Sequence, residues 1–371
     1  MIQAGRALEF GRPLRVLHLV QGIAFAGSER HVLALAIESR KLGYDAEIAC
    51  SRRAKALRKA AHAAGIHTKS LVDARRSEPD IVHVHDGRSA VLGAGLAAIT
   101  GAAFVRTQHF VRPASVERAG WRGRSSVAFH RLLNRRLDGY ICVSEAVAEA
   151  ARARRDVARA ICTVIPSGVD LPGSDEVKQF TAARSAALHL TVVSAGRLEP
   201  ERRFDVLLDA IPVLRRVVPG CRFVIAGAGS AEEDLKSRSR QLGIEDAVEW
   251  TGWLPEIASL LGASHIYVNT WPWEGFGMAT AEAMGAALPV VAVDSGASPE
   301  LVASGVTGLL VPPADSAALA AALCDLLADR ERMALMGAAG RERSMARYSM
   351  QATAESTVDF YRSLPRVPRE R

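Results

Sequence analysis

The sequence has few of the features that mark a disulfide-bonded or zinc-binding protein. Its 371 residues include five cysteines, and no two of them form a CxxC pair. Single cysteines in or beside apolar, strand-like runs are typical of buried thiols in a reducing compartment. We therefore expect neither a disulfide framework nor a cysteine zinc site. The five are Cys50, Cys142, Cys162, Cys221 and Cys324.

Long apolar runs are also missing. The first twenty residues have no signal-peptide pattern, because Glu9, Arg12 and Arg15 interrupt the apolar stretch. The run at 89–105 is rich in Gly and Ala and is shorter than the roughly 20 residues of a membrane helix. A buried helix, a turn at Gly101 and the start of a strand explain it better. We expect a cytoplasmic protein, with peripheral contact at the inner face of the membrane as an open alternative.

No segment resembles a zinc finger, a homeodomain or an RNP aromatic pair, so nucleic acid is the least favoured partner. The net charge of +7 and the pI near 9.4 nevertheless suggest an acidic partner. A phosphorylated small molecule and an anionic membrane surface both fit. A composition of 49% hydrophobic and 23% charged residues is that of a soluble globular protein, and the length suits two domains.

Short β-branched runs alternate with alanine-rich helical stretches along the whole chain. This alternation predicts an α/β fold with parallel sheets covered by helices on both faces. The expected strands are 14–20, 45–51, 81–85, 103–109, 139–144 and 162–168 in the first half, and 190–197, 221–229, 248–252, 265–270, 289–293 and 307–312 in the second.

The strand pattern restarts after a stretch rich in Gly, Pro and charged residues, 168–189, which suits a linker. We expect an N-terminal domain at 1–168, a C-terminal domain at 169–345 and a last helix at 346–371 that crosses back to the first domain. The helix of the first βα unit has Ser28 as its N-cap candidate and ends before Gly43.

Two glutamates are the only charges in the stretch WEGFGMATAEAMGAALPVVAV, which runs from 273 to 293. With a strand before them and a helix that begins near Met278, Glu274 lies in the loop and Glu282 about one turn into the helix. Ligands of open α/β sheets bind at this edge, where a carboxylate can accept sugar hydroxyl groups. Taken alone, Glu282 fits equally well as an acid that offsets the helix dipole.

Glycine-rich turns before helices leave backbone N–H groups that can approach an anion. We expect the N–H groups of Phe276, Gly277 and Met278 to face phosphate or sugar oxygens. Other candidates are Gly27 with Ser28, and Gly227. Close packing at such turns also requires glycine, so an anion-binding role and a purely structural role both stay open. No GxGxxG stands in its proper context, which makes a dinucleotide dehydrogenase a weak alternative.

The segment GRLEPERRFDVLLDA concentrates arginines at a strand end and a helix start. Arg197 follows the strand, and Arg202 and Arg203 precede the helix. Cations near a helix N-terminus are disfavoured by the dipole, and a bound phosphate would reverse that penalty. The alternative is a solvated basic turn paired with Glu199 and Glu201.

The two glutamates form an E-x7-E in EGFGMATAEAM, and this resembles the signature of retaining GT-B glycosyltransferases of family 4, the glycosyl transferases group 1. The segments AGSERHVLALA, DIVHVH, ICVSEAV, VIPSGVDL, GRLEPERRFDVLLDA and SPELVASGVTGLLVPPAD resemble family segments in family order. The resemblance covers residues 14 to 345. It implies the GT-B fold, in which two Rossmann-like parallel-sheet domains face a central cleft.

The resemblance also implies roles for individual residues. Glu282 would bind the ribose of a nucleotide-diphosphate sugar, and Glu274 would bind the donor sugar. Arg197 and Arg202 would clamp the diphosphate. His109 would face the donor sugar, a role that depends on the family because a lone histidine after a strand is more often structural.

Gly27, in the first loop, would approach the phosphates or the acceptor. With Ser28, Phe276, Gly277, Met278 and Gly227 it completes the expected donor-binding set. The chain departs from the family at three places: Arg202-Arg203 replaces the usual Lys-Gly, Ala26-Gly27 replaces paired glycines, and Ser167 replaces an asparagine.

These residues lead to a hypothesis of a retaining hexosyl or related glycosyl transfer to an acceptor hydroxyl, in cell-envelope glycan, lipopolysaccharide or glycolipid synthesis. No DxD stands in a suitable loop, so we expect no metal and no cofactor. Glycoside hydrolysis ranks lower, since it needs no paired arginines. A nucleotide-sugar epimerase and a non-catalytic sugar-nucleotide sensor remain alternatives. Basic stretches at 51–65 and 112–140 fit either membrane contact or solvated helix faces.

Overall fold

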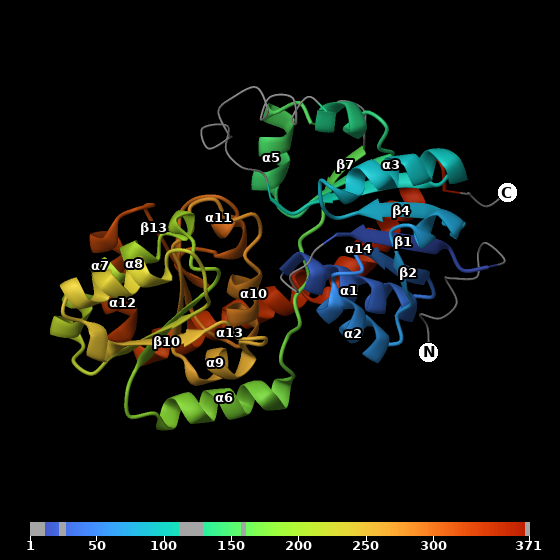
Figure 1. Ribbon diagram of the computed structural model, residues 1–371. Coiled ribbons are helices and arrows are strands. Elements are labelled where there is room, and N and C mark those ends of the chain that lie inside the picture. Colours follow the sequence, from blue (N-terminus) through green and yellow to red (C-terminus); the bar gives the residue numbers. More distant parts are fainter. Residues whose placement is uncertain (1–11, 22–26, 111–128, 157–160, 368–371) are drawn as a thin grey trace. The chain divides into compact units, whose positions relative to one another are not determined.

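The computed structural model describes residues 12–21, 27–110, 129–156 and 161–367 (Figure 1). The chain divides into two α/β units, each described here by itself. Unit 1 comprises the chain up to Gly168 together with the segment from Met350 onward, and unit 2 comprises Val169–Ser349. Most of the basic stretch at 112–140 lies outside the described residues, as does Ala26.

Unit 1 is built on a seven-stranded parallel sheet with the order β3-β2-β1-β4-β5-β6-β7. Its strands are β1 (Arg15–Val20), β2 (Asp45–Cys50), β3 (Thr68–Ser70), β4 (Ile81–Val84), β5 (Ala103–Gln108), β6 (Gly139–Cys142) and β7 (Ile161–Val164). Its described helices include α1 (Gly27–Lys41), α2 (Lys55–Ala63), η2 (Asp73–Arg76), α3 (Ser89–Thr100), α5 (Glu145–Ala153) and α14 (Met350–Ser363).

The helix α14 belongs to the core of unit 1, although unit 2 separates it from the rest of that unit in the sequence. Its side chains Val358 and Tyr361 share a buried cluster with Val16 of β1 and Val105 of β5. The contact is close: a Cβ added to Gly139 would lie 2.7 Å from the Phe360 ring.

Unit 2 is built on a six-stranded parallel sheet with the order β10-β9-β8-β11-β12-β13. Its strands are β8 (Thr191–Ala195), β9 (Arg222–Ala226), β10 (Val248–Gly252), β11 (Ile266–Asn269), β12 (Val290–Val293) and β13 (Gly308–Val311). Its helices are α6 (Ser174–Ala186), η4 (Pro200–Arg202), α7 (Phe204–Val217), α8 (Glu232–Gln241), η5 (Glu245–Ala247), α9 (Ala258–Ala263), α10 (Met278–Gly285), α11 (Ser298–Leu301), α12 (Ser316–Leu327) and α13 (Arg330–Arg347).

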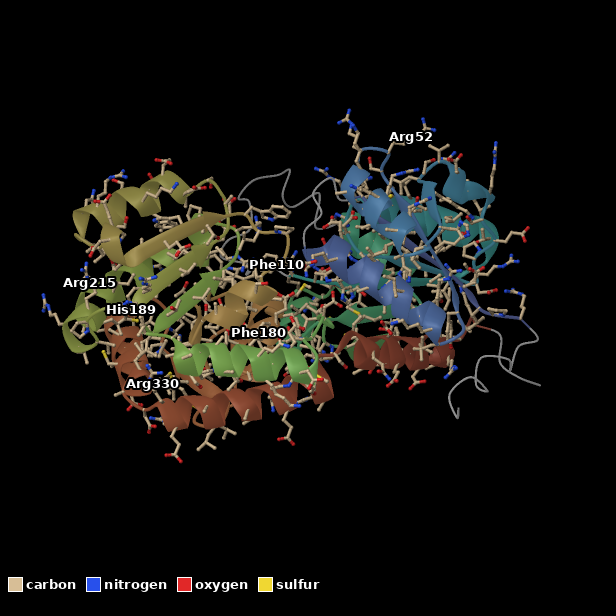
Figure 2. All side chains as sticks on the ribbon, turned by 90° about the horizontal axis from the view of Figure 1, so that it is seen from below. Arg52, Phe110, Phe180, His189, Arg215 and Arg330 are labelled. Atoms are coloured by element: carbon tan, nitrogen blue, oxygen red, sulfur yellow. The ribbon has the colours of Figure 1, made fainter. Side chains whose placement is uncertain are left out.

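The stretch expected to be a linker contains the helix α6. Two acids in its first turn suit the positive end of the helix dipole. The Arg184 guanidinium donates to the Ala286 carbonyl at 2.9 Å and so ties the helix to the end of α10. Phe180, labelled on this helix in Figure 2, packs where Gly262 of α9 leaves room, since a Cβ there would lie 2.4 Å from the ring.

The apolar run at 89–105 forms the expected helix, turn and strand: α3 ends at Gly101, whose φ of 75° is left-handed, and β5 follows. Across the described ranges, every helix is too short or too polar to cross a bilayer. The five cysteines are free thiols. One prediction was wrong: Ser28 does not cap α1, because the helix begins at Gly27 and Ser28 donates to the Glu29 carboxylate instead.

Candidate functional site

The expected site residues of unit 2 follow the carboxyl ends of β8, β9 and β11. The loop after β8 carries Arg197 and leads into η4, and the loop after β11 carries Glu274 and leads into α10. The carboxyl edge of a parallel sheet is where open α/β folds bind ligands. The alternation of strands and helices therefore places these loops together.

Arg202 is a largely buried cation at the centre of this edge, with 19% of its side chain exposed. Its guanidinium lies 3.6 Å from the centre of the Trp271 ring, and its Nη1 lies 3.7 Å from a Glu274 oxygen. Thr270 anchors its backbone through a 2.9 Å hydrogen bond. Burial lowers the pKa of Arg202, although Glu274 acts in the opposite direction. Its Nε has no hydrogen-bond partner within the described part of the chain.

Glu274 is more deeply buried than Arg202, with 10% of its side chain exposed. The Asn269 amide donates to it at 3.2 Å, and the backbone N–H groups of Gly275 and Phe276 donate to it as well. Burial raises its pKa above 4.5, and these donors and Arg202 offset only part of that effect. The Phe276 N–H thus contacts a protein carboxylate here, which differs from the expectation that it faces a ligand.

Glu282 and Met278 lie on α10, which begins at Met278 as expected. Gly277 precedes the helix with a φ of 98°, a left-handed conformation that favours glycine. Glu282 is the fifth residue of the helix and is half-buried. Burial is the main cause that raises the pKa of Tyr267, and Glu274 and Glu282 raise it further, so the two carboxylates act on one small region.

The loop after β12 holds Glu274 from the other side. A Cβ added to Gly296 would lie 2.7 Å from the Glu274 nitrogen, and the Ala297 N–H donates to the Glu274 carbonyl at 2.9 Å. The sequence reasoning missed Asn269, Trp271 and Gly296. The polar end of the strand HIYVNT was a signal for Asn269, but nothing local marks Gly296 as a neighbour of Glu274.

The remaining arginines of unit 2 differ in their surroundings. Arg197 is exposed and lowers the pKa of Arg202, which shows that the two like charges are close. Arg203 instead pairs with Asp205 at 2.9 Å. Its φ of 57° lies in the region that favours glycine, the residue usual there in the family that the sequence resembles.

Gly227 has a packing reason for its identity. Its φ is 148°, and a Cβ there would lie 1.8 Å from the Gly196 carbonyl oxygen. Its N–H donates to the Gly252 carbonyl at 2.8 Å. The loops after β8 and β9 therefore meet at these glycines, and the Gly227 N–H is already used.

Three expected site residues belong to unit 1. Gly27 is exposed at the start of α1, with the half-buried Ser28 beside it. His109 follows β5 and is half-buried, and its Nε2 lies 3.5 Å from His85 Nδ1. Among the described residues, His18, His83 and His85, and also His31, His85 and His109, form groups whose ring nitrogens could hold a metal ion.

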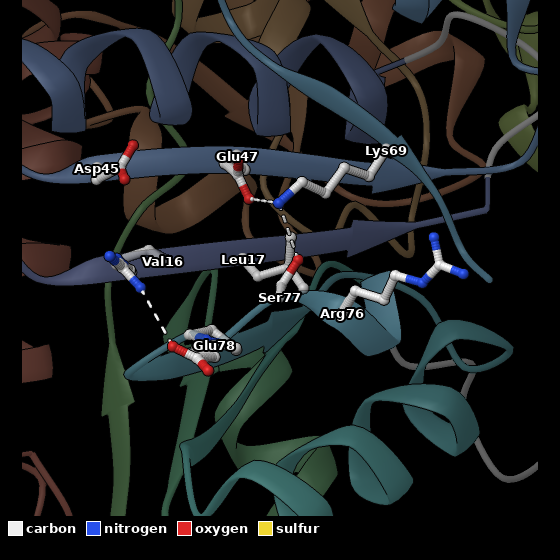
Figure 3. Close-up of a pocket in the computed structure, with 10 residues that line it drawn as sticks. Val16, Leu17, Asp45, Glu47, Lys69, Arg76, Ser77 and Glu78 are labelled. Carbon is white, nitrogen blue, oxygen red and sulfur yellow. Dashed lines mark hydrogen bonds and ion pairs between the residues drawn. The ribbon is translucent and has the colours of Figure 1, made fainter. Parts of the chain in front are cut away.

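A hollow of about 230 Å³ in unit 1 lacks the features of a donor site. Two ion pairs lie among the residues that line it: Lys69 lies 2.6 Å from Glu47, as Figure 3 shows, and Arg15 lies 3.8 Å from Glu78. It includes Asp45 at the amino end of β2, the edge of the sheet opposite to where such folds bind ligands.

The arrangement in unit 2 combines two kinds of recognition. Glu274 is a buried carboxylate that can accept hydrogen bonds from hydroxyl groups. Arg202 and Arg197 are two like charges that act on each other, and they can hold a diphosphate. A hydroxyl-bearing diphosphate is the ligand that satisfies both halves.

Comparisons with known proteins agree with this chemistry. Residues 25–172 match the model of Glycosyltransferase Family 4, and residues 181–343 match that of Glycosyl transferases group 1. The glycogen synthase of Mycobacterium tuberculosis is 30% identical over 83% of this chain and 74% of its own length. The crystal structure of Anabaena Alr3699/HepE in complex with UDP, 20% identical, has a TM-score of 0.81 and covers 95% of this chain and all of that one.

A further relative is the GDP-mannose-dependent alpha-(1-6)-phosphatidylinositol monomannoside mannosyltransferase of M. tuberculosis. It is 34% identical over 53% of this chain, and the match spans 55% of that enzyme's length. With its two parallel-sheet units, its E-x7-E loop and these matches over most of its length, the chain belongs to the family 4 glycosyltransferases of the GT-B fold.

Proposed function

We propose that the protein transfers a sugar from a nucleotide-diphosphate sugar to an acceptor hydroxyl with retention of the anomeric configuration. The observation that carries the proposal is the pairing of buried Glu274 with the stacked, buried Arg202 at the carboxyl edge of the unit 2 sheet. Burial of the Glu274 carboxylate costs free energy, and the Nε of buried Arg202 has no hydrogen-bond partner among the described residues. Charged groups in such surroundings are typical of ligand-binding sites.

The roles follow from the chemistry of the leaving group. Departure of a nucleoside diphosphate builds negative charge, and Arg202 and Arg197 stabilise it in a partly dehydrated place. Glu274 orients the donor sugar and Glu282 the ribose. We propose that this charge stabilisation needs no metal. For His109 of unit 1 we propose the role that the family resemblance implies, which is to face the donor sugar.

A transfer assay with Glu274→Ala and Arg197→Ala tests the proposal. GDP-mannose and UDP-glucose are the first donors to test. A similar mannosyltransferase depends on GDP-mannose, and a structure of the same fold was solved in complex with UDP. We expect each variant to lose at least ~2 kcal/mol of transition-state stabilisation, roughly 30-fold in kcat/KM. Arg215→Ala is the matched control, since Arg215 pairs with Asp246 on the surface. Near-wild-type transfer by Glu274→Ala would overturn the assignment.

Product analysis separates the proposal from its rivals. The anomeric coupling in the NMR spectrum of the product reports retention or inversion. Incubation of the donor without acceptor identifies an epimerase by a changed sugar, and binding without turnover under every acceptor identifies a sensor. Transfer that persists with excess EDTA supports the metal-free mechanism.

We further propose a lipid-linked or envelope-glycan acceptor, as in the glycolipid enzyme named above. The basic stretch around α2 presents Arg52, Arg53, Lys55 and Lys59 to solvent while Leu57 is buried, and Figure 2 shows Arg52 at the edge of the molecule. This face suits an anionic surface. Co-sedimentation with anionic vesicles at low salt tests it, and absence of binding would indicate a soluble acceptor.

A further inference from the structure

Five histidines of unit 1 gather around the carboxyl ends of β1, β4 and β5. His18 and His83 are register partners on β1 and β4, and His85 follows β4. His31 comes from α1 and His109 follows β5. All are buried except the half-buried His109. Nothing in the proposed transfer chemistry requires so many imidazoles in one place.

The three rings of His31, His85 and His109 have the spacing of a metal site. One ring nitrogen of each lies within 4.8 Å of those of the other two. His85 Nδ1 and His109 Nε2 are 3.5 Å apart, which is long for a hydrogen bond. Two nitrogens bound to one tetrahedral zinc ion lie about 3.3 Å apart, given Zn–N bonds of about 2.05 Å. The nitrogens of His85 and His109 are therefore already close to the spacing that a zinc ion requires.

Two further contacts of these histidines favour a metal site: one ring nitrogen of His31 is unpaired among the described residues, and the ring of His85 is oriented by a neighbour. His31 Nδ1 has no hydrogen-bond partner among the described residues, and it is buried, because only 4% of His31 is exposed. His85 Nε2 lies 3.1 Å from His18 Nδ1, so the ring nitrogen that faces away from His109 is held in place. Metal-binding histidines in proteins are oriented in this way through their second nitrogen.

The alternative trio of His18, His83 and His85 fits less well. Both nitrogens of His83 are already hydrogen-bonded, to Tyr361 at 2.5 Å and to Thr107 at 2.7 Å. An ion there would have to displace one of these bonds inside a fully buried region.

The charge state of the histidines suits metal binding. Burial lowers the pKa of His31 to about 3 and, with a contribution from Arg106, that of His109 to about 4, so both are neutral at pH 7. A neutral imidazole offers the lone pair that a metal ion needs.

We propose that His31, His85 and His109 form a three-imidazole site for a divalent transition-metal ion such as zinc. Imidazole suits zinc, copper and nickel rather than magnesium or calcium. Three protein ligands leave a fourth position of the ion for water, and the transfer proposed above does not depend on this ion. His109 would keep its Nδ1 for another partner.

Isothermal titration of the full-length protein with zinc chloride alone tests the site. The protein carries no histidine tag and is first treated with a chelator that is then removed. We expect one ion per chain, and cobalt in place of zinc should give the visible absorption of a nitrogen-ligated tetrahedral ion. Less than one ion per chain in the wild type, or cobalt absorption of a purely oxygen-ligated ion, would overturn the proposal.

Variants show whether the ion occupies this site. His31→Gln and His109→Gln should each weaken zinc binding by roughly 100-fold, and His18→Gln by roughly 10-fold through loss of the support for His85. His62→Gln, at an exposed position on α2, should leave it unchanged. Circular dichroism shows whether each variant is folded, and each ligand is tested separately so that one unfolded variant does not decide the result. Equal affinity in wild type, His31→Gln and His109→Gln would exclude the site. Donor binding at Glu274 is measured independently of zinc binding, so failure of the metal site and failure of the proposed function give different results.

Discussion

At the scale of single residues, the unit 2 site contains two buried charges that stabilise each other incompletely. Glu274 and Arg202 lie 3.7 Å apart, farther than a close ion pair, and burial shifts the pKa of each toward its neutral form. An incomplete pair costs folding free energy. It also leaves both groups able to bind a ligand that carries hydroxyl and phosphate oxygens.

The raised pKa of Glu274 predicts a pH dependence of stability. Its pKa is above 4.5 in the folded state, so the folded protein holds this proton to a higher pH than the unfolded chain does. As pH rises from about 4.5 through the folded pKa, this residue makes unfolding progressively easier. We expect Glu274→Gln to gain stability relative to wild type across that window. Urea unfolding of both proteins from pH 4 to 8 measures the difference, and a constant difference would contradict it.

The left-handed backbone of Arg203 predicts an unusual effect of glycine. Arg203→Gly relieves a φ of 57° but loses the ion pair with Asp205. The strain costs about 1 kcal/mol, and a partly exposed ion pair contributes less than that. We expect the variant to be as stable as the wild type or more stable, and Arg203→Ala to be less stable than Arg203→Gly. Thermal unfolding of the pair checks the order.

The sequence predicts the charged members of the site better than the neutral ones. Glu274 and Arg202 stand out because charges are rare or electrostatically disfavoured where they occur. Gly296 contacts Glu274 from a loop after another strand, and its role depends on a distance between backbones that no local pattern encodes. The histidine group escaped notice for a similar reason, because its members come from four separate segments.

At the scale of elements, most strands and the start of α10 follow from the alternation of apolar residues. The expected strand 248–252 agrees with β10 at both ends. The helix α6 was mistaken for a linker because its charges and flanking Gly and Pro resemble one. Its helical state depends on Arg184 and Phe180, which find their partners in α9 and α10.

The helix α14 is held to the unit 1 sheet by a buried polar contact as well as by apolar packing. Tyr361→Phe removes the hydroxyl that bonds His83 Nδ1 and leaves that nitrogen unsatisfied. We expect a loss of about 1–3 kcal/mol in the unfolding free energy of unit 1. Hydrogen exchange of β4 and α14 measures it. Tyr348→Phe is the matched control, because it loses a 3.0 Å bond to the Glu300 carbonyl in unit 2. If both variants loosened the same unit, the assignment of α14 would be wrong.

At the scale of the whole molecule, the two units have separate cores, and the proposed donor contacts with Glu274, Arg197 and Arg202 belong to unit 2 alone. A nucleoside diphosphate at 100 times its Kd should therefore stabilise unit 2 by about 2.7 kcal/mol. Hydrogen exchange with and without GDP or UDP should show slower opening of β8 and β11. Slowing confined to unit 1 would contradict the donor assignment.

The return of α14 to unit 1 has a consequence for the way the protein is made. Unit 2 is continuous in the sequence, from Val169 to Ser349, so a nascent chain can complete it before α14 leaves the ribosome. Unit 1, although most of it is translated first, keeps the apolar face that Val358, Phe360 and Tyr361 cover exposed until that helix emerges. The half of the enzyme that is synthesised earliest is therefore the half that finishes folding last.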